Sequence, residues 1–147
     1  MRMRDHEYVT DLFLLAARSE EGCRAAAQRF TSQPFRIRFA QFARQRARCT
    51  ATLALKLLSL GGDPNSLLAR SRHHDHIWNG ARRAPNDDAL LAEAIRSEAI
   101  VVSAYERALS SVASHDARTI VRTQYTLLSE SLDQLRALAA ARTATEP

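Results

Sequence analysis

The spacing of apolar residues along the chain predicts four long helices. In each of four segments, apolar side chains recur at intervals of three and four residues, the period of a helix with one buried face. These segments are residues 5–30, 35–60, 87–113 and 116–141. No stretch of useful length alternates apolar and polar residues, so strands are not expected. The pattern favours an all-α protein built as a four-helix bundle.

The lengths of the connections predict the order in which these helices run. Short turns near Pro34 and Ser114 join the first helix to the second and the third to the fourth. The second and third helices are separated by residues 61–86, far more than an adjacent antiparallel pair needs. A helix of about 25 residues is roughly 38 Å long, so this crossover can travel the length of the bundle. We therefore expect the up-down-down-up arrangement of ferritin-like bundles, with residues 1–141 as a single domain and 142–147 as a frayed tail.

The crossover itself contains signals for a short helix. Asp63 and Pro64 suit a helix start and Gly80 lies near a stop. Trp78 is expected to anchor this helix to the bundle. The neighbouring His73 and His76 are three residues apart, the spacing of a metal-binding pair, but the sequence offers few further ligands nearby. A polar linker is the favoured interpretation, and these histidines remain weak metal candidates.

Two acidic residues fall on apolar seams. Glu20 lies on the seam of the first helix and Glu98 on that of the third, each near mid-height. Burying two carboxylates side by side is very unfavourable unless a positive group neutralises them. Ferritin-like di-iron proteins use metal for this purpose, with two further Glu-x-x-His pairs. Here no Glu-x-x-His occurs on the second or fourth helix, where Glu130 is the central carboxylate of the fourth.

An arginine offers another solution. Arg46 lies on the seam of the second helix at a matching height, and a guanidinium stays charged while offering five donors. We expect Arg46 to take the place of a metal between Glu20 and Glu98, with Gln45 or Gln124 completing the hydrogen bonds. In the alternative arrangement, a small helix rotation lets either glutamate reach solvent. No metal or other cofactor is expected.

Composition and charge add a basic segment. The 147 residues carry 21 basic and 16 acidic side chains, a net charge of +5. Residues 34–60 contain no acid and hold the whole excess. Their arginines form a possible binding face for nucleic acid, although no base-reading motif accompanies them; this face comprises Arg36, Arg38, Arg44 and Arg48.

The cysteine content and the N-terminal segment favour a soluble protein of a reducing compartment. Two cysteines, Cys23 and Cys49, do not make a disulfide framework. The apolar run "LFLLAA" is too short for a signal-peptide core or a membrane span. We expect a cytoplasmic location and no membrane partner.

Several stretches together resemble a family of small, uncharacterised bacterial four-helix-bundle proteins of the ferritin-like class. They are "EEGCRAAAQRF", "FARQRARCTATL" with "LGGDP", "DDALLAEAIRSEAIVVSAYERAL" and "DQLRAL". The resemblance implies a domain of unknown function, a link to stress response and no established catalytic activity. Leu132 stands where the relatives carry His, which weakens any inherited metal site.

Taken together, these features favour a non-enzymatic bundle that acts by association, most simply as a homodimer. The basic second helix and the acidic third helix suggest electrostatic complementarity between copies. A di-iron metal protein and a nucleic-acid-binding protein are the alternatives. No spacing of nucleophile and base indicates catalysis.

Overall fold

The computed structural model describes residues 2–71 and 77–145, and within them every regular element is a helix. The long helices are α1 (Arg2–Arg29), α2 (Gln33–Ser59), α4 (Asp87–Ser111) and α5 (His115–Thr145). The connection between α2 and α4 carries α3 (Pro64–Arg70) and the 3-10 turn η1 (Ala81–Arg83). No strand occurs in the described part of the chain. The predictions of an all-helical protein and of a helical bundle are confirmed.

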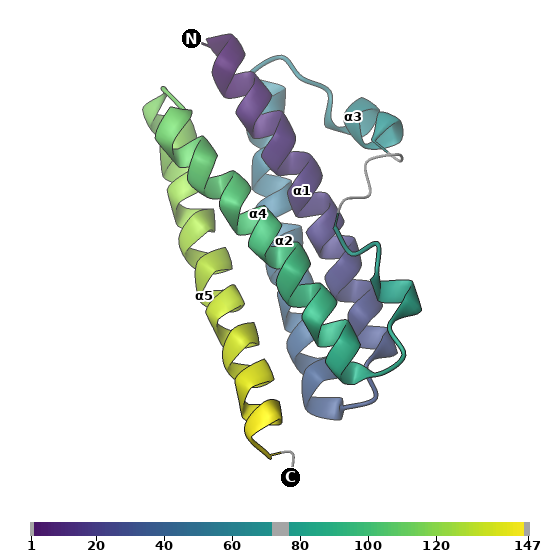
Figure 1. The fold of residues 1–147 in the computed structure, drawn as a ribbon. Helices are drawn as coiled ribbons and strands as arrows, with labels where there is room; N and C mark the ends of the chain where they lie inside the picture. The colour runs from purple at the N-terminus through teal and green to yellow at the C-terminus, as the bar shows by residue number, and fades with distance from the viewer. Residues whose placement is uncertain (1, 72–76, 146–147) are drawn as a thin grey trace.

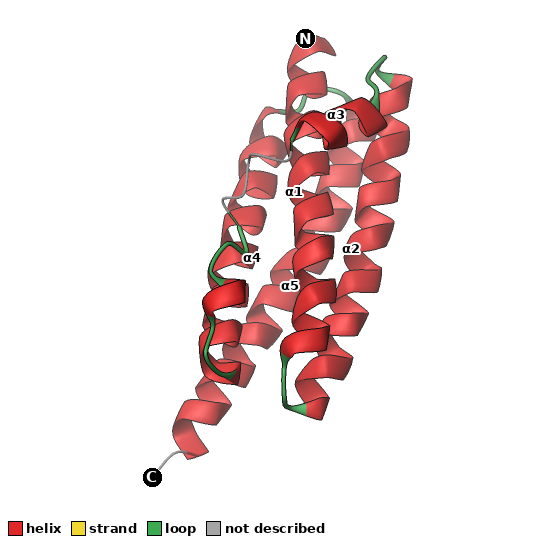
Figure 2. Ribbon diagram, turned by 90° about the vertical axis from the view of Figure 1, so that its right-hand side faces the viewer, coloured by secondary structure: helices red, strands yellow, loops and turns green. Residues whose placement is uncertain are grey.

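The four long helices form two antiparallel hairpins that lie side by side (Figures 1 and 2). The α1–α2 turn lies next to the start of α4, because Asp87 accepts hydrogen bonds from the Thr31 and Ser32 amides. The start of α1 lies next to the α4–α5 turn in the same way. Helix α4 is therefore antiparallel to α1 and parallel to α2, with the crossover spanning the length of the bundle.

Local sequence explains where the helices begin and end. Ser32 caps α2 through its hydroxyl, which accepts from the Phe35 amide at 3.4 Å, and Pro34 occupies the first turn, where its missing N–H is not needed. Gly61 follows α2 with a positive φ of 89°, a conformation that glycine adopts without strain. Asn86 caps α4 by accepting from the Ala89 amide at 2.9 Å.

Two buried aspartates fasten the ends of the bundle. Asp87, in the first turn of α4, accepts from the Thr31 amide at 2.9 Å, the Thr31 hydroxyl at 2.8 Å and the Ser32 amide at 2.9 Å. Asp5, in the first turn of α1, accepts from the amides of Ala113 and Ser114 at 2.8 and 3.0 Å. Each hairpin therefore supplies the aspartate that binds the turn of the other.

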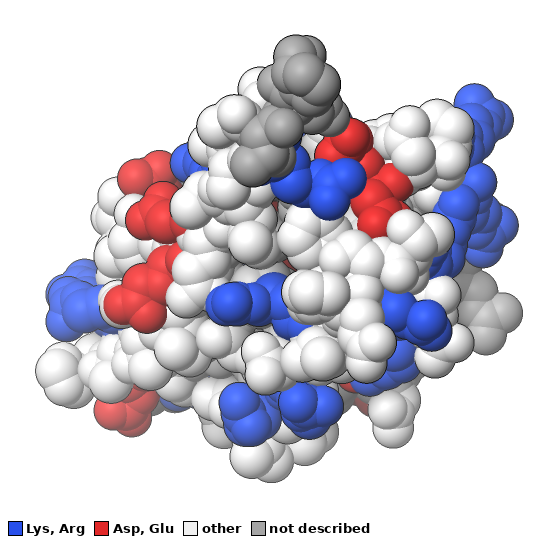
Figure 3. Space-filling model, turned by 90° about the horizontal axis from the view of Figure 1, so that it is seen from below, with Lys and Arg blue, Asp and Glu red and all other residues white. Residues whose placement is uncertain are grey.

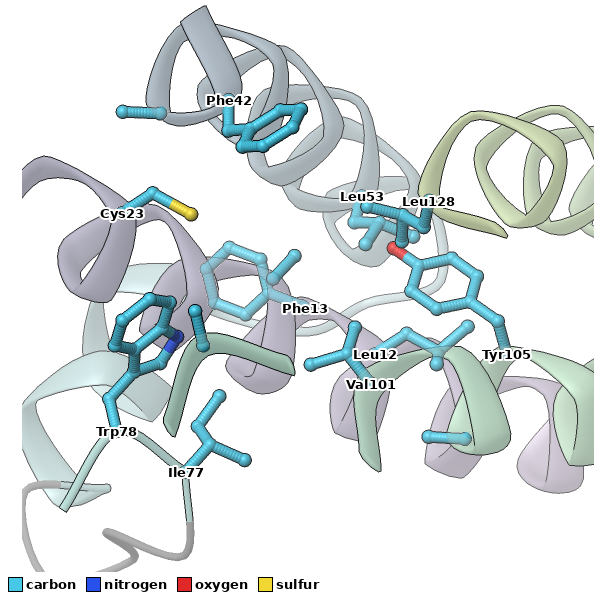
Figure 4. Close-up of a cluster of buried hydrophobic side chains, with 14 of the residues drawn as sticks. Leu12, Phe13, Cys23, Phe42, Leu53, Ile77, Trp78, Val101, Tyr105 and Leu128 are labelled. Carbon is cyan, nitrogen blue, oxygen red and sulfur yellow. The ribbon is translucent and has the colours of Figure 1, made fainter. Parts of the chain in front are cut away.

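The core is continuous along the bundle and rich in aromatic rings at the end where α1 meets α2. Phe30, Phe35, Phe39 and Phe42 form a chain of ring contacts with centroids 4.7 to 5.5 Å apart. Figure 4 shows side chains of the long helices and of the crossover, among them Trp78, directed into one common interior. Edge-to-face contacts of this kind add to the apolar burial that holds helices together.

The helix of the crossover is shorter than predicted, whereas Trp78 contacts the bundle as predicted. The helix that begins at Pro64 ends at Arg70 instead of extending towards Gly80. Trp78 is 8% exposed and its amide donates to the Ser97 hydroxyl of α4 at 2.7 Å. His73 and His76 lie outside the described residues.

Gly22 explains how Trp78 reaches the interior. A Cβ built on Gly22 would lie 2.3 Å from two atoms of the Trp78 ring, which is well inside any permitted contact. The indole therefore packs directly on the backbone of α1. Trp78 itself has a φ of 63°, a left-handed conformation that is uncommon for a bulky residue. Residue 22 must be glycine for this packing.

At the C-terminal end, α5 continues beyond residue 141, where the sequence pattern predicts fraying. Arg142 donates to Asp88 at 2.5 Å, and its guanidinium lies 5.2 Å from the centre of the Phe35 ring. These contacts tie the last turns of α5 to the bundle and extend the helix to Thr145. No helix among the described residues is long and apolar enough to cross a membrane.

Candidate functional site

A charged pair occupies the middle of the bundle. Arg46 of α2 and Glu98 of α4 are each 1% exposed, and Nη2 of Arg46 lies 3.4 Å from Oε1 of Glu98. Such burial is unfavourable for either charge alone, because each ion loses its hydration. The two charges are therefore stable in this position only together and with further hydrogen bonds.

Helix α1 supplies the first of these hydrogen bonds. The Ser19 hydroxyl donates to Oε1 of Glu98 at 2.7 Å and accepts from Nε of Arg46 at 3.2 Å. The Cys23 thiol, one turn further along α1, lies 3.4 Å from the same carboxylate oxygen. Ser19 and Cys23 are both fully buried. One small hydroxyl thus bridges the two charged side chains.

Gln45 of α2 and Ser131 of α5 supply the hydrogen bonds on the other side of the Arg46 guanidinium. Nη1 of Arg46 donates to Oε1 of Gln45 and to the Ser131 hydroxyl, the latter at 3.4 Å. Ser131 in turn donates to Gln45 at 3.1 Å. The resulting group draws one or more side chains from each long helix, and we call it the buried charged layer: Ser19, Cys23, Gln45, Arg46, Glu98 and Ser131.

This layer leaves two polar atoms without hydrogen bonds among the described residues. They are Oε2 of Glu98 and Nη2 of Arg46, the latter within ion-pair distance but not in hydrogen-bond geometry. Buried polar atoms are usually paired in native proteins. The layer is thus electrostatically balanced but not fully satisfied.

Burial changes the chemistry of the nearby thiol and phenol. Burial raises the pKa of Cys23 well above its ordinary value, and the Glu98 carboxylate raises it further, against the opposite effect of Arg46. Burial also raises the pKa of Tyr105 well above its ordinary value. Because the thiolate is the reactive form of cysteine, Cys23 is not activated for nucleophilic chemistry.

The structure corrects the expected role of Glu20. This carboxylate lies at the edge of the bundle, with a side chain 20% exposed, and pairs with Arg24 one turn along the same helix. Ser19, the preceding residue, takes the interior position. Successive helical residues point about 100° apart, so the seam of α1 passes through Ser19 and leaves Glu20 beside it.

Gln124 also lies outside the buried charged layer. Its Oε1 accepts from the Tyr105 hydroxyl at 2.5 Å, and its Nε2 donates to the carbonyl of Cys49 at 3.2 Å. It links α4, α5 and α2 in a second buried polar group. Of the two glutamines considered from sequence, Gln45 is the one that contacts Arg46.

The carboxylates considered as metal ligands are not gathered. Glu20 is paired at the surface, Glu98 faces Ser19 and Arg46, and Glu130 is exposed on α5. Within residues 2–71 and 77–145, no three His, Cys, Asp or Glu side chains are grouped in a way that could hold a metal ion. These residues do not fit the di-iron pattern.

The four arginines of the expected basic face point in different directions. Arg36 donates to the carbonyl of Ala27 at the end of α1, whereas Arg38 donates to Gln134 of α5. Arg44 and Arg48 are exposed on the outer side of α2. Arg36 is thus directed towards α1 and Arg38 towards α5, with Arg44 and Arg48 on the exposed side between them.

Sequence reasoning missed the small members of the buried charged layer. Ser19, Cys23 and Ser131 are residue types that pack in many cores without a special role, so composition gives no signal for them. The contact of Trp78 with α1 had a signal that was available, because a glycine inside a long helix, as in "EEGCR", favours close approach of another group.

Comparison with known proteins gives a family but no activity. The family model described as a domain of unknown function (DUF2383) matches residues 8–111, which include most of α1 and all of α2, the crossover and α4. No curated protein matches the chain.

Proposed function

This chain belongs to the DUF2383 family of unknown function, and we propose that it works by pairing with a second copy of itself rather than by catalysis. The pairing surface is the outer face formed by α2 and the adjoining side of α5, here called the α2–α5 face. We further propose that the scaffold is of the ferritin-like class, which is supported by the parallel α2 and α4 and the long crossover between them.

The observation that carries this proposal is the distribution of exposed apolar side chains. Five large hydrophobic side chains are exposed among the described residues, and four of them lie on α2 and α5. These four are Ile37 (54% exposed), Leu55 (69%), Leu58 (57%) and Leu127 (37%). The fifth, Leu68, is on α3. Exposed large apolar side chains concentrated on two neighbouring helices favour a protein interface on this side of the bundle.

The α2–α5 face is also hollowed between its two helices. A groove of about 370 Å³ runs there, with Thr52, Thr123 and Leu127 among its walls and Gln124 at its floor. Apart from Arg48, the residues lining it are uncharged. Interface cores are depleted in charged residues, so the groove and the flanking leucines suit contact with another protein.

Charge on this face favours a second copy as the partner. Two hydrogen bonds set the register between α2 and α5: one joins Gln45 and Ser131, and the other joins Gln124 and Cys49. By this register, Arg44 on α2 stands level with Glu130 on α5. A two-fold axis parallel to the helices would set Arg44 of each copy opposite Glu130 of the other.

Three acidic residues of α4 are engaged within the molecule. Glu93 pairs with Arg96 on the same helix, Glu98 is buried, and Asp87 is occupied by the α1–α2 turn. The charge complementarity that we propose for pairing therefore uses Glu130 of α5.

The proposed pairing predicts a strong effect of single substitutions. Burying a leucine side chain is worth about 1.5–3 kcal/mol, and in a symmetric interface each residue contributes from both copies. Leu55→Glu removes this burial twice and introduces two charges. The dissociation constant should rise by at least about 100-fold.

Sedimentation velocity over a concentration series, with circular dichroism to verify folding, measures this effect. Leu55→Glu and Leu127→Glu should each convert dimer to monomer. Leu68→Glu is the matched control, because it places the same charge on an exposed leucine outside the α2–α5 face, and it should leave the dimer intact. The charge reversal Arg44→Glu should weaken pairing, and adding Glu130→Arg should restore it.

Two results would contradict the proposal. A wild-type protein that sediments as a monomer at all concentrations has no self-association to explain. A dimer that is disrupted by Leu68→Glu but not by Leu55→Glu pairs through another surface.

A further inference from the structure

Four arginines gather at the end of the bundle where α1 ends and α4 begins. They come from three separate segments and are here called the end arginines: Arg29 of α1, Arg36 of α2, and Arg82 and Arg83 of η1. All four are exposed. Figure 3 views this end and shows basic side chains in several places around it.

Hydrogen bonds to backbone carbonyls hold Arg29 and Arg36 at this end of the bundle. Nη2 of Arg29 donates to the carbonyls of Arg82 and Ala84 at 3.2 and 3.5 Å, which fixes η1 against the end of α1. Nε of Arg36 donates to the carbonyl of Ala27, one turn before α1 ends, at 3.3 Å. These partners are neutral, and each guanidinium has five N–H donors, so the positive charges are not cancelled by these contacts.

The acidic residues of this end are engaged elsewhere. Asp87 is turned into the bundle, where it holds Thr31 and Ser32. Asp88 pairs with Arg142 of α5. Arg82 and Arg83 form no side-chain hydrogen bond or ion pair with any other part of the described chain. The surface around η1 therefore carries an excess of positive charge that folding does not use.

We propose that the end arginines bind the phosphate backbone of duplex nucleic acid, without preference for sequence. Several cations on three segments suit a ligand with several phosphates, and arginine forks match phosphate oxygens in paired hydrogen bonds. No Phe, Tyr or Trp among the described residues is exposed, so stacking on unpaired bases has no platform here. Contacts to phosphates alone position a protein on a duplex but do not read its sequence.

An anionic membrane is a less suitable ligand for this end. Membrane surfaces bind proteins through inserted apolar side chains together with basic ones. Of the exposed large hydrophobics, only Ile37 lies in the first turns of α2, and the others lie further along the bundle or on α3. The end arginines thus offer charge without an apolar anchor.

The experiment measures binding of a fluorescent duplex of mixed sequence by anisotropy over a series of salt concentrations. Four phosphate contacts predict a slope of log K against log salt of about −3.6, or roughly 150-fold weaker binding at 200 mM than at 50 mM salt. Arg82→Gln/Arg83→Gln should reduce the slope by about 2. Both side chains are exposed, so this variant should fold normally, as circular dichroism can verify.

Arg70→Gln/Arg107→Gln is the matched control, because it removes the same charge from exposed arginines of α3 and α4 that lie outside both the end arginines and the α2–α5 face. It should leave the affinity for duplex and the salt slope unchanged. The proposal is overturned if both variants lose affinity equally, since binding then follows net charge alone. It is also overturned if the protein binds phosphatidylserine vesicles but no duplex.

Discussion

Removing one ion of the buried charged layer should destabilise the protein far more than removing both. Two opposite charges 3.4 Å apart attract by roughly 5 kcal/mol at an effective dielectric constant of about 20. Removing the hydration of each ion opposes this attraction by several kcal/mol. The pair therefore contributes little net stability, but an ion that is buried without its partner retains the whole cost of losing its hydration.

The single substitutions should therefore be severe. Glu98→Leu leaves the Arg46 guanidinium buried without its counter-ion and should lower the free energy of unfolding by about 3–5 kcal/mol. Arg46→Met leaves the Glu98 carboxylate buried without its counter-ion and should also be strongly destabilising. The double variant Arg46→Met/Glu98→Leu should lie within about 1 kcal/mol of the wild type or exceed it.

Urea unfolding followed by circular dichroism at 222 nm gives these free energies, with the slope m verifying that each variant unfolds in the same way. Glu20→Gln is the matched control, because it breaks the surface pair with Arg24 and should change stability by less than about 1 kcal/mol. A double variant as unstable as the sum of the singles, or a Glu98→Leu variant as stable as the wild type, would refute the reasoning.

Two further predictions concern the crossover and the ends of the bundle. Gly22→Ala should destabilise the protein by about 1–3 kcal/mol, because its Cβ would overlap the Trp78 ring. In a Trp78→Ala background the same substitution should stabilise the protein by up to about 1 kcal/mol, because alanine has the higher helix propensity. Thermal unfolding of the wild type, the two single variants and the double variant tests this change of sign. Burial raises the pKa of Asp5 and Asp87, but hydrogen bonds to each carboxylate outweigh burial and lower it below the ordinary value of 3.8. The stability from these groups is present above that value and is lost as pH falls through the lowered pKa. Asp5→Asn/Asp87→Asn should therefore unfold more easily in urea at pH 7, and its difference from wild type should shrink progressively as pH falls below about 4.

The helices could be predicted from sequence because their apolar periodicity extends over many turns and their connections are short or conspicuously long. The predicted positions of the helix ends were less accurate, because the ends depend on single side chains. Asn86 caps α4, for example, and Arg142 holds the last turns of α5. The crossover helix ended early because Ser71 and Trp78 are positioned by α1 and α4, and these contacts leave no local sequence pattern.

The charged pair could be anticipated because a charged residue on an apolar seam needs a partner. Arg46 and Glu98 met that condition, and the structure places them in contact. Glu20 could not be distinguished from Ser19 in this way, because a seam read from sequence is uncertain by about one position in helix rotation. The roles of Ser19 and Ser131 depend on the alignment of three helices, which no single helix encodes.

The reciprocal placement of Asp5 and Asp87 has a consequence for how the molecule melts. Each hairpin carries the carboxylate that closes the turn of the other, so neither half has complete hydrogen bonding at its turn when the other is absent. The two halves should consequently lose their structure in one cooperative transition. For the same reason, a chain cut within the crossover should yield two fragments that are unstable apart and reassemble when mixed.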